Sequence, residues 1–473
     1  MANTGKFYIG GHWVDPVQTN FADVINPASE EAVARIAMGS AADVDRAAQA
    51  AAAAFPSFSM TTRKQRIDLL NAILNELEKR LDDIAAAMTM EMGAPSILSR
   101  TSQAQSGYDH IATMVKVLED FPFEEMREST MISREAIGVC GLITPWNWPI
   151  NQITCKVAPA LAAGCTMVLK PSEIAPLNAL IFAEVLHDAG VPAGVFNLVN
   201  GDGLSVGAIM AAHPLIDMVS FTGSTRAGIE VAKLAAGTVK RVAQELGGNS
   251  PNIVFDDANL QEAIEGGIAN CFNNSGQSCN SPARMLVPFG KMREAADIAK
   301  RAAEALKVGD PRDAATNLGP VVSEQHFNKI QKMIETGISE GATLVTGGPG
   351  RPEHLNRGYF VRPTVFADVS PQMTIANTEI FGPVMTMVGY ETEADAIRIA
   401  NDTEYGLAAY LQTSDPARAR RVARLLRAGQ VEINYAPFDY FAPFGGYKQS
   451  GNGREYGEFG LHDYLETKAT MGL

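Results

Sequence analysis

Residues 138–222 alternate short apolar runs with longer, helix-length segments. The runs read GVCGLIT (Gly138–Thr144), TMVLK (Thr166–Lys170), VFNLVN (Val195–Asn200) and MVSFT (Met218–Thr222). A helix-length segment, Ala175–Ala189, separates the second run from the third. Parallel strands need a crossover of a dozen or more residues, usually a helix. The alternation therefore predicts repeated βαβ units on a parallel sheet, and so an α/β fold.

A second series of the same kind follows Asn249. It comprises an apolar run, a helical segment, another run and another helical segment, with further signals to Val431: Asn252–Phe255, Ala258–Asn273, Met285–Pro288 and Lys291–Lys307. This series predicts another α/β domain.

The remaining segments are helical near the N-terminus and extended elsewhere. Apolar residues recur at spacings of three and four in Ala42–Phe55 and Arg63–Met92, and the second helix should stop at Met92–Pro95. Thr130–Ser133 and Tyr464–Met471 look like isolated strands, which need a sheet to join.

Composition excludes several classes of protein. The 473 residues are 46% hydrophobic and 19% charged, which argues against wholesale disorder. The net charge of −14 should repel phosphate backbones, so we expect no nucleic-acid partner. The longest apolar run, Val157–Leu169, is too short for a bilayer, which needs about 20 residues. We expect no membrane span.

The N-terminus and the metal-binding residue types give three further expectations. The N-terminus, MANTGKFYIGGHW, lacks a secretory signal, so we expect a cytoplasmic protein. The 5 cysteines show no C-x-x-C spacing and the 7 histidines form no H-E-x-x-H motif. We therefore expect free thiols and no metal.

Two residues are candidates for catalysis. Cys279 lies among small and polar residues in Asn273–Asn280, whereas Cys140, Cys155 and Cys165 sit in apolar runs typical of inert, buried thiols. Glu245 precedes two glycines. From local context alone Cys279 could equally be structural, no histidine partner is identifiable from spacing, and Glu245 could be one more solvated surface residue.

Two glycine strings follow predicted strands and should open helices. They are Gly201-x-Gly203-x-x-x-Gly207 and Gly223–Gly228. Neither fits G-x-G-x-x-G, but backbone amides at a helix start attract phosphate, so together they favour nucleotide binding over plain turns. Gly203–Gly207 also matches G-x-S-x-G, which leaves a serine hydrolase using Ser205, with a later Asp and His462, as an alternative.

An ordered series of motifs resembles the NAD(P)-dependent aldehyde dehydrogenase superfamily, in its hydrolytic branch that does not acylate coenzyme A. The motifs span most of the chain: TPWNWP (Thr144–Pro149), KPSE (Lys170–Glu173), FTGS (Phe221–Ser224), ELGG (Glu245–Gly248), GQSC (Gly276–Cys279), EIFGP (Glu379–Pro383) and PFGGYK (Pro443–Lys448). A non-catalytic protein that retains the fold is a further alternative.

The resemblance implies a chemical role for five residues. Cys279 would attack the aldehyde to form a thiohemiacetal, and later a thioester, while the Asn147 amide and the Cys279 N–H hold the oxyanion. Glu245 would activate the water that hydrolyses the thioester. Lys156 and Glu455 match positions proposed to relay protons, although a simple buried ion pair is an equal alternative.

The resemblance also implies NAD as cofactor, with NADP possible. The residues it assigns to the cofactor are Ile143, Trp146, Lys170, Ser172, Glu173, Gly203, Gly207, Gly223, Ser224, Gly228, Glu379 and Phe381. Glu173 would repel the 2′-phosphate of NADP, which favours NAD. His326 stands where many relatives have a glutamine that touches the nicotinamide ribose, so that contact is open.

The substrate would be an aldehyde whose tail lies among aromatic rings. The assigned residues are Trp148, Asn151, Gln152, Ser278, Asn280, Phe438, Tyr440 and Phe441. We expect a largely apolar wall that favours medium-chain aliphatic or aromatic aldehydes, unless some rings pack a subunit interface instead. No arginine lies between Asn434 and Gly446 to bind a distal carboxylate.

The fold implied is a Rossmann-like cofactor domain, a second α/β catalytic domain and a small β oligomerisation element. We assign residues 1–119, 137–247 and 446–464 to the first, 248–445 to the second, and 120–136 with 465–473 to the third. Strand edges of such an element are normally completed by another subunit, so we expect a homodimer or homotetramer.

Overall fold

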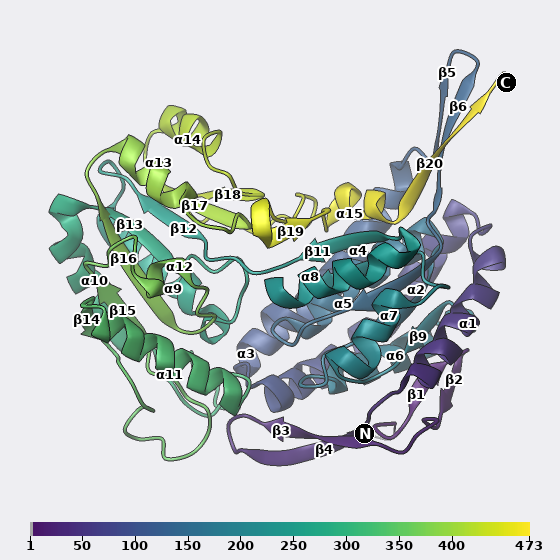
Figure 1. Ribbon diagram of the computed structural model, residues 1–473, viewed down its shortest axis with the longest axis horizontal. Helices are drawn as coiled ribbons and strands as arrows, with labels where there is room; N and C mark the ends of the chain where they lie inside the picture. Colours follow the sequence, from purple (N-terminus) through teal and green to yellow (C-terminus); the bar gives the residue numbers. More distant parts are fainter. Residues whose placement is uncertain (1–2) are drawn as a thin grey trace.

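The computed structural model describes residues 3–473 and contains two large sheets with helices on both faces (Figure 1). The first sheet has eight strands in the order β19-β11-β10-β7-β8-β9-β1-β2. Their bounds are β1 Phe7–Ile9, β2 His12–Val14, β7 Val139–Ile143, β8 Thr166–Lys170, β9 Phe196–Leu198, β10 Met218–Thr222, β11 Arg241–Glu245 and β19 Gly451–Asn452. The five strands from β11 to β9 run parallel. The predicted parallel sheet is confirmed.

Helices cover both faces of this sheet because apolar side chains point to both faces, at alternating positions along each strand. Cys140 and Leu142 of β7 pack into the core with α2, α4, α5 and α6, whereas Val139 and Ile143 pack with α1, α7 and α8. The helices are α1 Ala41–Phe58, α2 Arg63–Met92, α3 Ser96–Leu98, α4 Gln105–Asp120, α5 Pro149–Ala163, α6 Leu177–Asp188, α7 Ala208–Ala212, α8 Thr225–Ala235 and α15 Gly457–Asp463.

Helix α2 has the predicted bounds because both of its ends carry a cap. The hydroxyl of Thr62 accepts a hydrogen bond from the Gln65 N–H, and the Gln65 side chain bonds back to the Thr62 N–H. At the other end Gly93 adopts a left-handed φ of 80°. A Cβ there would also lie 2.5 Å from a ring carbon of Pro320. Both the backbone conformation and the lack of space therefore require glycine at this position.

The second sheet has seven strands in the order β14-β15-β16-β13-β12-β17-β18. It is parallel except for β14, and its strands are β12 Pro251–Val254, β13 Arg284–Pro288, β14 Thr343–Thr346, β15 Thr364–Ala367, β16 Val384–Tyr390, β17 Ala408–Gln412 and β18 Gln430–Ile433. Its helices are α9 Leu260–Phe272, α10 Met292–Glu304, α11 Glu324–Ser339, α12 Thr374–Asn377, α13 Glu393–Asn401 and α14 Pro416–Ala423. This confirms the second predicted α/β series.

The two isolated strands of the sequence join each other. Strand β20 (Leu465–Met471) pairs antiparallel with β6 (Thr130–Ala136), which also pairs with β5 (Glu124–Arg127). These three strands extend from the body as an arm at the upper right of Figure 1.

Four N-terminal strands were missed at the sequence level. Strands β1 and β2 are three residues each, and β1 pairs with β9, nearly 190 residues away. Strands β3 (Phe21–Asn26) and β4 (Glu31–Ala37) form a separate hairpin whose residues are mostly exposed. Strands of three residues are too short to show a period of two, and apolar residues in β3 and β4 stand next to one another rather than alternating strictly with polar ones.

Within residues 3–473 no helix combines the length and the hydropathy that crossing a bilayer demands. In the same residues no cluster of three or more His, Cys, Asp or Glu side chains could hold a metal ion. All five cysteines are free thiols.

Candidate active site

Cys279 follows a strained turn that leads out of helix α9. Asn274, Ser275 and Gly276 have φ values of 54°, 56° and 74°, three left-handed residues in succession. At Gly276 a Cβ would lie 2.1 Å from the Gly382 carbonyl oxygen, so only glycine fits there. Left-handed φ values are uncommon for non-glycine residues, and here they belong to Asn274 and Ser275, whose side chains are both buried.

Cys279 lies where two cavities meet. One cavity has a volume of about 430 Å³ and is lined by Trp148, Asn280 and Tyr456 among others. The second, of about 200 Å³, is lined by Trp146, Glu379 and others. Among residues 3–473, Cys279 is the one residue that lines both cavities. A thiol at this junction can reach one ligand from each side.

The Cys279 thiol has an unfavourable environment for ionisation in the free protein. Burial is the largest cause of its raised pKa, and the carboxylates of Glu379 and Glu245 add to it. The backbone N–H of Asn280 acts in the opposite direction because it donates to the sulfur.

A hydrogen-bonded network fixes Asn147 against the cysteine segment. Asn147 is 4% exposed, and its Nδ2 donates to the Gln277 carbonyl at 3.1 Å. Asn274 Nδ2 donates to the Asn147 carbonyl at 2.8 Å, and Gln103 Nε2 donates to Asn274 Oδ1 at 3.1 Å. One amide hydrogen of Asn147 is left for another acceptor. Sequence reasoning did not identify Gln103 or Asn274, whose roles depend on contacts across the fold.

Glu245 ends strand β11 in a buried position beside, but not in, the two cavities. It is 3% exposed, and neither carboxyl oxygen has a hydrogen-bond partner. Burial raises its pKa well above the usual range, and the nearby charge of Glu455 raises it further. A buried carboxyl group with no partner is a typical catalytic acid or base.

Lys156 and Glu455 form a buried ion pair near Glu245. Lys156 is fully buried, Glu455 is 7% exposed, and the two are in direct contact. Burial is the largest single influence on the pKa of Lys156 and lowers it, but the charges of Glu455, Cys155 and Glu245 and the hydrogen bond to Glu455 together outweigh burial and leave the pKa raised. The Cys155 thiol donates to the other Glu455 oxygen at 3.4 Å. The ion pair exists, and it lies close enough to Glu245 to influence its charge.

The smaller cavity contains five of the residues assigned to the cofactor: Trp146, Gly223, Ser224, Glu379 and Phe381. Glu379 Oε1 accepts a hydrogen bond of 2.7 Å from the Gly248 N–H, and burial raises the Glu379 pKa to about 7. The rings of Trp146 and Phe381 stand edge to face, 5.6 Å apart.

His326 lines the same cavity. Burial lowers its pKa to about 4, so the ring is neutral at pH 7. Its Nε2 lies 2.7 Å from the Phe381 carbonyl oxygen, which can only accept, so Nε2 carries the hydrogen. This bond holds Phe381, whose φ is 62°.

The other residues assigned to the cofactor lie outside this cavity, most of them where the parallel strands end. Ile143 and Lys170 end β7 and β8, and Lys170 Nζ lies 3.0 Å from Glu173 Oε2. The Ser172 hydroxyl accepts a hydrogen bond from the Ile174 N–H. Within α8, a Cβ on Gly228 would lie 2.5 Å from Leu246.

The first glycine string forms a π-helical turn, Gly203–Gly207, that caps itself. Asp202 Oδ1 accepts from the N–H groups of Leu204 and Ser205 at 2.8 and 2.6 Å. In residues 3–473 no histidine hydrogen bonds to Ser205, and His462 pairs instead with Glu458. The hydrolase alternative lacks its base.

Seven of the residues assigned to the substrate line the larger cavity: Trp148, Asn151, Gln152, Ser278, Asn280, Phe438 and Tyr440. The indole Nε1 of Trp148 donates to the Ser278 hydroxyl at 2.8 Å. Phe441, the eighth residue assigned to this wall, does not line the cavity. The Phe441 N–H donates to Asp439 Oδ1 at 2.9 Å, and this local turn leaves Phe441 47% exposed and outside the cavity.

The lining is less apolar than expected, because more than half of its residues are polar. Phe444 and Tyr456 stack 5.0 Å apart and supply rings that sequence reasoning missed. Asp109 and Glu432 add two carboxylates. Further polar lining residues come from the π-helical turn Ser99–Ala104, from α4, from α9 and from the segment around Cys279, so no single stretch of sequence carries the signal: Thr101, Ser102, Gln105, Ser106, Asn270, Asn273 and Ser281.

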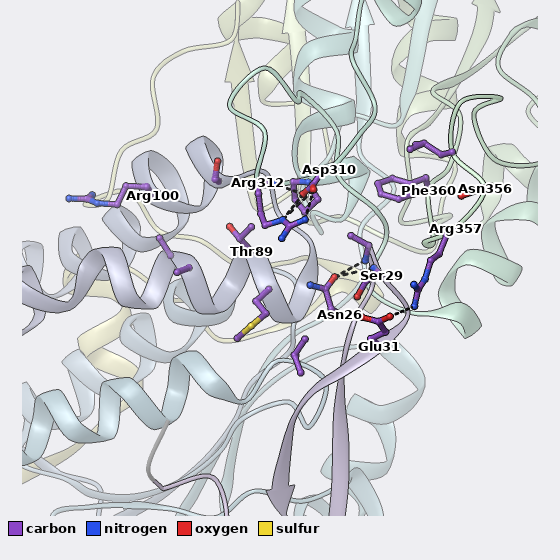
Figure 2. Close-up of a pocket in the computed structure, with 18 of the residues that line it drawn as sticks. Asn26, Ser29, Glu31, Thr89, Arg100, Asp310, Arg312, Asn356, Arg357 and Phe360 are labelled. Carbon is purple, nitrogen blue, oxygen red and sulfur yellow. Dashed lines mark hydrogen bonds and ion pairs between the residues drawn. The ribbon is translucent and has the colours of Figure 1, made fainter.

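A larger cavity, of about 920 Å³, lies between α2, the β3–β4 hairpin and two loops of the second series (Figure 2). Its charged groups already have partners: Arg357 lies 2.9 Å from Glu31, and Arg312 lies 2.6 Å from Asp310. No cysteine lines it. Volume alone therefore does not identify the reactive site.

Comparisons with known proteins point to one family. The model of the aldehyde dehydrogenase family matches residues 13–470. The 3-succinoylsemialdehyde-pyridine dehydrogenase of a Pseudomonas species is 53% identical over 100% of this chain and 99% of its own length.

Solved structures show the same fold. Aldehyde dehydrogenase C of Pseudomonas syringae, a mutant in complex with NAD+ and octanal, superposes with a TM-score of 0.99 at 52% identity, covering 99% of this chain and 97% of that one. A Mycobacterium tuberculosis aldehyde dehydrogenase complexed with NAD+ gives 0.96 at 39% identity, with 99% and 98% coverage. This chain belongs to the aldehyde dehydrogenase family.

Proposed function

We propose that this protein oxidises an aldehyde to a carboxylic acid with NAD+, through a thiohemiacetal and then a thioester on Cys279. The observation that carries the proposal is the position of Cys279 at the junction of two cavities, one on each side of the thiol. Of the two cavities that meet at Cys279, the one of about 430 Å³ takes the aldehyde and the one of about 200 Å³ takes the nicotinamide end of the cofactor.

The smaller cavity fits a nicotinamide nucleotide. The first N–H groups of helix α8 have no acceptor within the helix, which suits a phosphate near Gly223 and Ser224. Glu379 can accept from ribose hydroxyls, and Trp146 and Phe381 present rings to a planar group. The bound cofactor would accept the hydride, and the positive charge of its ring would offset the carboxylates that disfavour the thiolate.

The adenosine end would lie across Lys170 and Glu173, with Ile143, Ser172, Gly203, Gly207 and Gly228 around the same strand ends. A 2′-phosphate would meet the Glu173 carboxylate, so we propose that NAD is preferred to NADP. A higher kcat/KM with NADP than with NAD would contradict this preference.

The chain's own groups would carry the acyl chemistry. The free Asn147 amide hydrogen and the Cys279 N–H would hold the oxyanion that develops when Sγ attacks the carbonyl carbon. Glu245 would then take a proton from the water that attacks the thioester. Because Glu245 is buried beside the Lys156–Glu455 pair, that pair would pass the proton outward.

We further propose the division of the chain made from the sequence: a cofactor domain (1–119, 137–247 and 446–464), a catalytic domain (248–445) and an oligomerisation element (120–136 and 465–473). Supporting the last, β5 and β20 are edge strands and Met126 and Met471 on them are 55% and 80% exposed. The homodimer or homotetramer this predicts can be tested by analytical ultracentrifugation.

The substrate class proposed is medium-chain aliphatic or aromatic aldehydes. Ring-bearing residues such as Trp148, Phe444 and Tyr456 support it, as do the octanal and the pyridine named for two relatives. The test is NADH formation at 340 nm with a panel of aldehydes and both cofactors. No turnover with any aldehyde would overturn the proposed function.

A further inference from the structure

Glu432 is a carboxylate on the wall of the substrate cavity with no partner. It lies on β18 in register with Tyr410 of β17, so the two side chains share one face of the sheet. The Tyr410 hydroxyl donates to the carbonyl of Asn280, next to Cys279, at 2.9 Å. Glu432 therefore lies on the strand next to Tyr410, which contacts the residue that follows Cys279. Within residues 3–473 its side chain makes no hydrogen bond or ion pair.

The groups around Glu432 do not supply a counter-charge. The hydroxyl of Tyr435, the next cavity residue along the chain, donates to the Ala263 carbonyl at 2.6 Å. Asp109 of α4 adds a second carboxylate to the same cavity, and its Oδ1 accepts from Gln105 Nε2 at 3.0 Å. In the part of the chain that the structure describes, no lysine, arginine or histidine lines the cavity. His110, beside Asp109, is buried, and burial lowers its pKa to about 3, so it is neutral.

A third acceptor in the same cavity is buried and unpartnered. Gln152 of α5 is 4% exposed, and its Oε1 has no hydrogen-bond partner. A buried acceptor without a donor costs free energy, on the order of 1–3 kcal/mol, unless a bound molecule supplies the donor. Gln152 lines the cavity, so its side-chain amide is a third polar group there, besides the two carboxylates.

We propose that Glu432, Asp109 and Gln152 form a tail subsite that admits aldehydes whose tail carries a cation or another hydrogen-bond donor and rejects aldehydes with an anionic tail. The inference rests on the proposed function and refines its substrate class. Repulsion between two like charges in a partly desolvated cavity is much stronger than in water. Selectivity then comes from what the cavity repels as much as from what it binds.

The test uses two pairs of aldehydes of matched shape. Succinic semialdehyde is compared with its methyl ester, and 4-trimethylammoniobutanal with its uncharged isostere 5,5-dimethylhexanal. In the unmodified protein we expect kcat/KM to favour the ester over the acid by about tenfold or more. Glu432→Gln should reduce this preference at least about fivefold and lower the cation-to-isostere ratio. Comparing the ratios between variants cancels the intrinsic reactivity of each aldehyde.

Two further variants make the result decisive. Glu353→Gln removes the same charge from an exposed loop residue outside both active-site cavities and should leave both ratios unchanged. Asp109→Asn should move the ratios in the same direction as Glu432→Gln, and it decides the matter if Glu432→Gln fails to fold. Ratios that stay within about twofold in the folded carboxylate variants, while aldehydes are still oxidised, would overturn the tail subsite alone. Absence of all turnover in the unmodified protein would instead overturn the proposed function.

Discussion

The backbone of Gly248 lies directly against the carbonyl of Cys279: a Cβ at Gly248 would stand 2.0 Å from that oxygen. The contact joins the loop after Glu245 to the turn that carries the thiol. The backbone N–H of the same residue, Gly248, donates a hydrogen bond to Glu379 Oε1 at 2.7 Å. One glycine thus holds together the segments of the proposed nucleophile, the proposed base and a cofactor-side carboxylate.

Gly248→Ala should therefore impair both folding and turnover. A methyl group at 2.0 Å from a backbone oxygen forces the main chain apart, and overpacking of this kind costs about 1–3 kcal/mol. We expect a lower midpoint of urea unfolding and a fall of at least about a hundredfold in kcat, since small displacements at a reacting group are costly. Gly290→Ala is the matched control because no atom lies within 4 Å of its Cβ position. Full activity in Gly248→Ala would show that the two segments move independently.

Cys279→Ser should abolish dehydrogenase turnover while leaving the binding of NAD+ nearly intact, because a hydroxyl is far less nucleophilic than a thiolate. Isothermal titration calorimetry measures the binding. Iodoacetamide labelling followed by peptide mass spectrometry gives an independent check in the unmodified protein. Inactivation that tracks alkylation of the buried Cys271 or Cys140, with Cys279 unlabelled, would refute the assignment.

Glu245→Gln should separate the two halves of the reaction. The variant should form the acyl-enzyme and one equivalent of NADH quickly and then deacylate slowly, because the attacking water lacks a base. Stopped-flow absorbance at 340 nm should show a burst followed by a slow steady rate. A variant without a burst, but with unchanged cofactor affinity, would mean that Glu245 serves the first step, as the base for Cys279.

Phe444→Ala should weaken large substrates selectively, whereas Phe441→Ala should not. Phe444 is 4% exposed and lines the substrate cavity, whereas Phe441 is 47% exposed and lies outside it. Removing a buried ring costs the apolar area it shared with the ligand, at about 25 cal/mol per Å². The measurement is kcat/KM for octanal relative to propanal in both variants. An equal effect of the two substitutions would place Phe441 against the substrate after all.

Discrimination against anionic aldehydes should increase between pH 6 and pH 8. Burial raises the Glu432 pKa to about 7, so its carboxyl group is mostly neutral at pH 6 and mostly charged at pH 8. Asp109 shares the cavity, and the pKa values of Tyr410, Tyr435, Tyr440 and Tyr456 are all raised above 10, so these tyrosines stay neutral over this range.

The measured quantity is the ratio of kcat/KM for the methyl ester to that for succinic semialdehyde. Because both substrates use Cys279 and Glu245, the titration of those groups cancels in the ratio. The ratio should rise with pH in the unmodified protein and stay flat in Glu432→Gln. A rise of equal size in the variant would assign the effect to another group.

Local signals determined much of this fold. Strand β8 and helix α2 have the bounds that their residues predicted, because a strand covered on both faces shows a continuous apolar run, here residues 167–169, and the helix carries a cap at each end. The same holds for the recognition of Cys279, since the motifs around it, such as ELGG and GQSC, are short and contiguous. Element bounds and short motifs depend on residues that are close together in the chain, so they can be predicted from the sequence alone.

Only the tertiary structure decided which residues meet. Glu432 on β18 and Asp109 on α4 share one cavity, although more than 300 residues separate them in the chain. Phe441 and Phe444 look equivalent in sequence, but an Asp439 turn exposes the first and the stack on Tyr456 buries the second. The pairing of β1 with β9 likewise comes from sheet assembly. Contacts of this kind depend on long-range packing, and no local pattern encodes which distant partner a side chain will find.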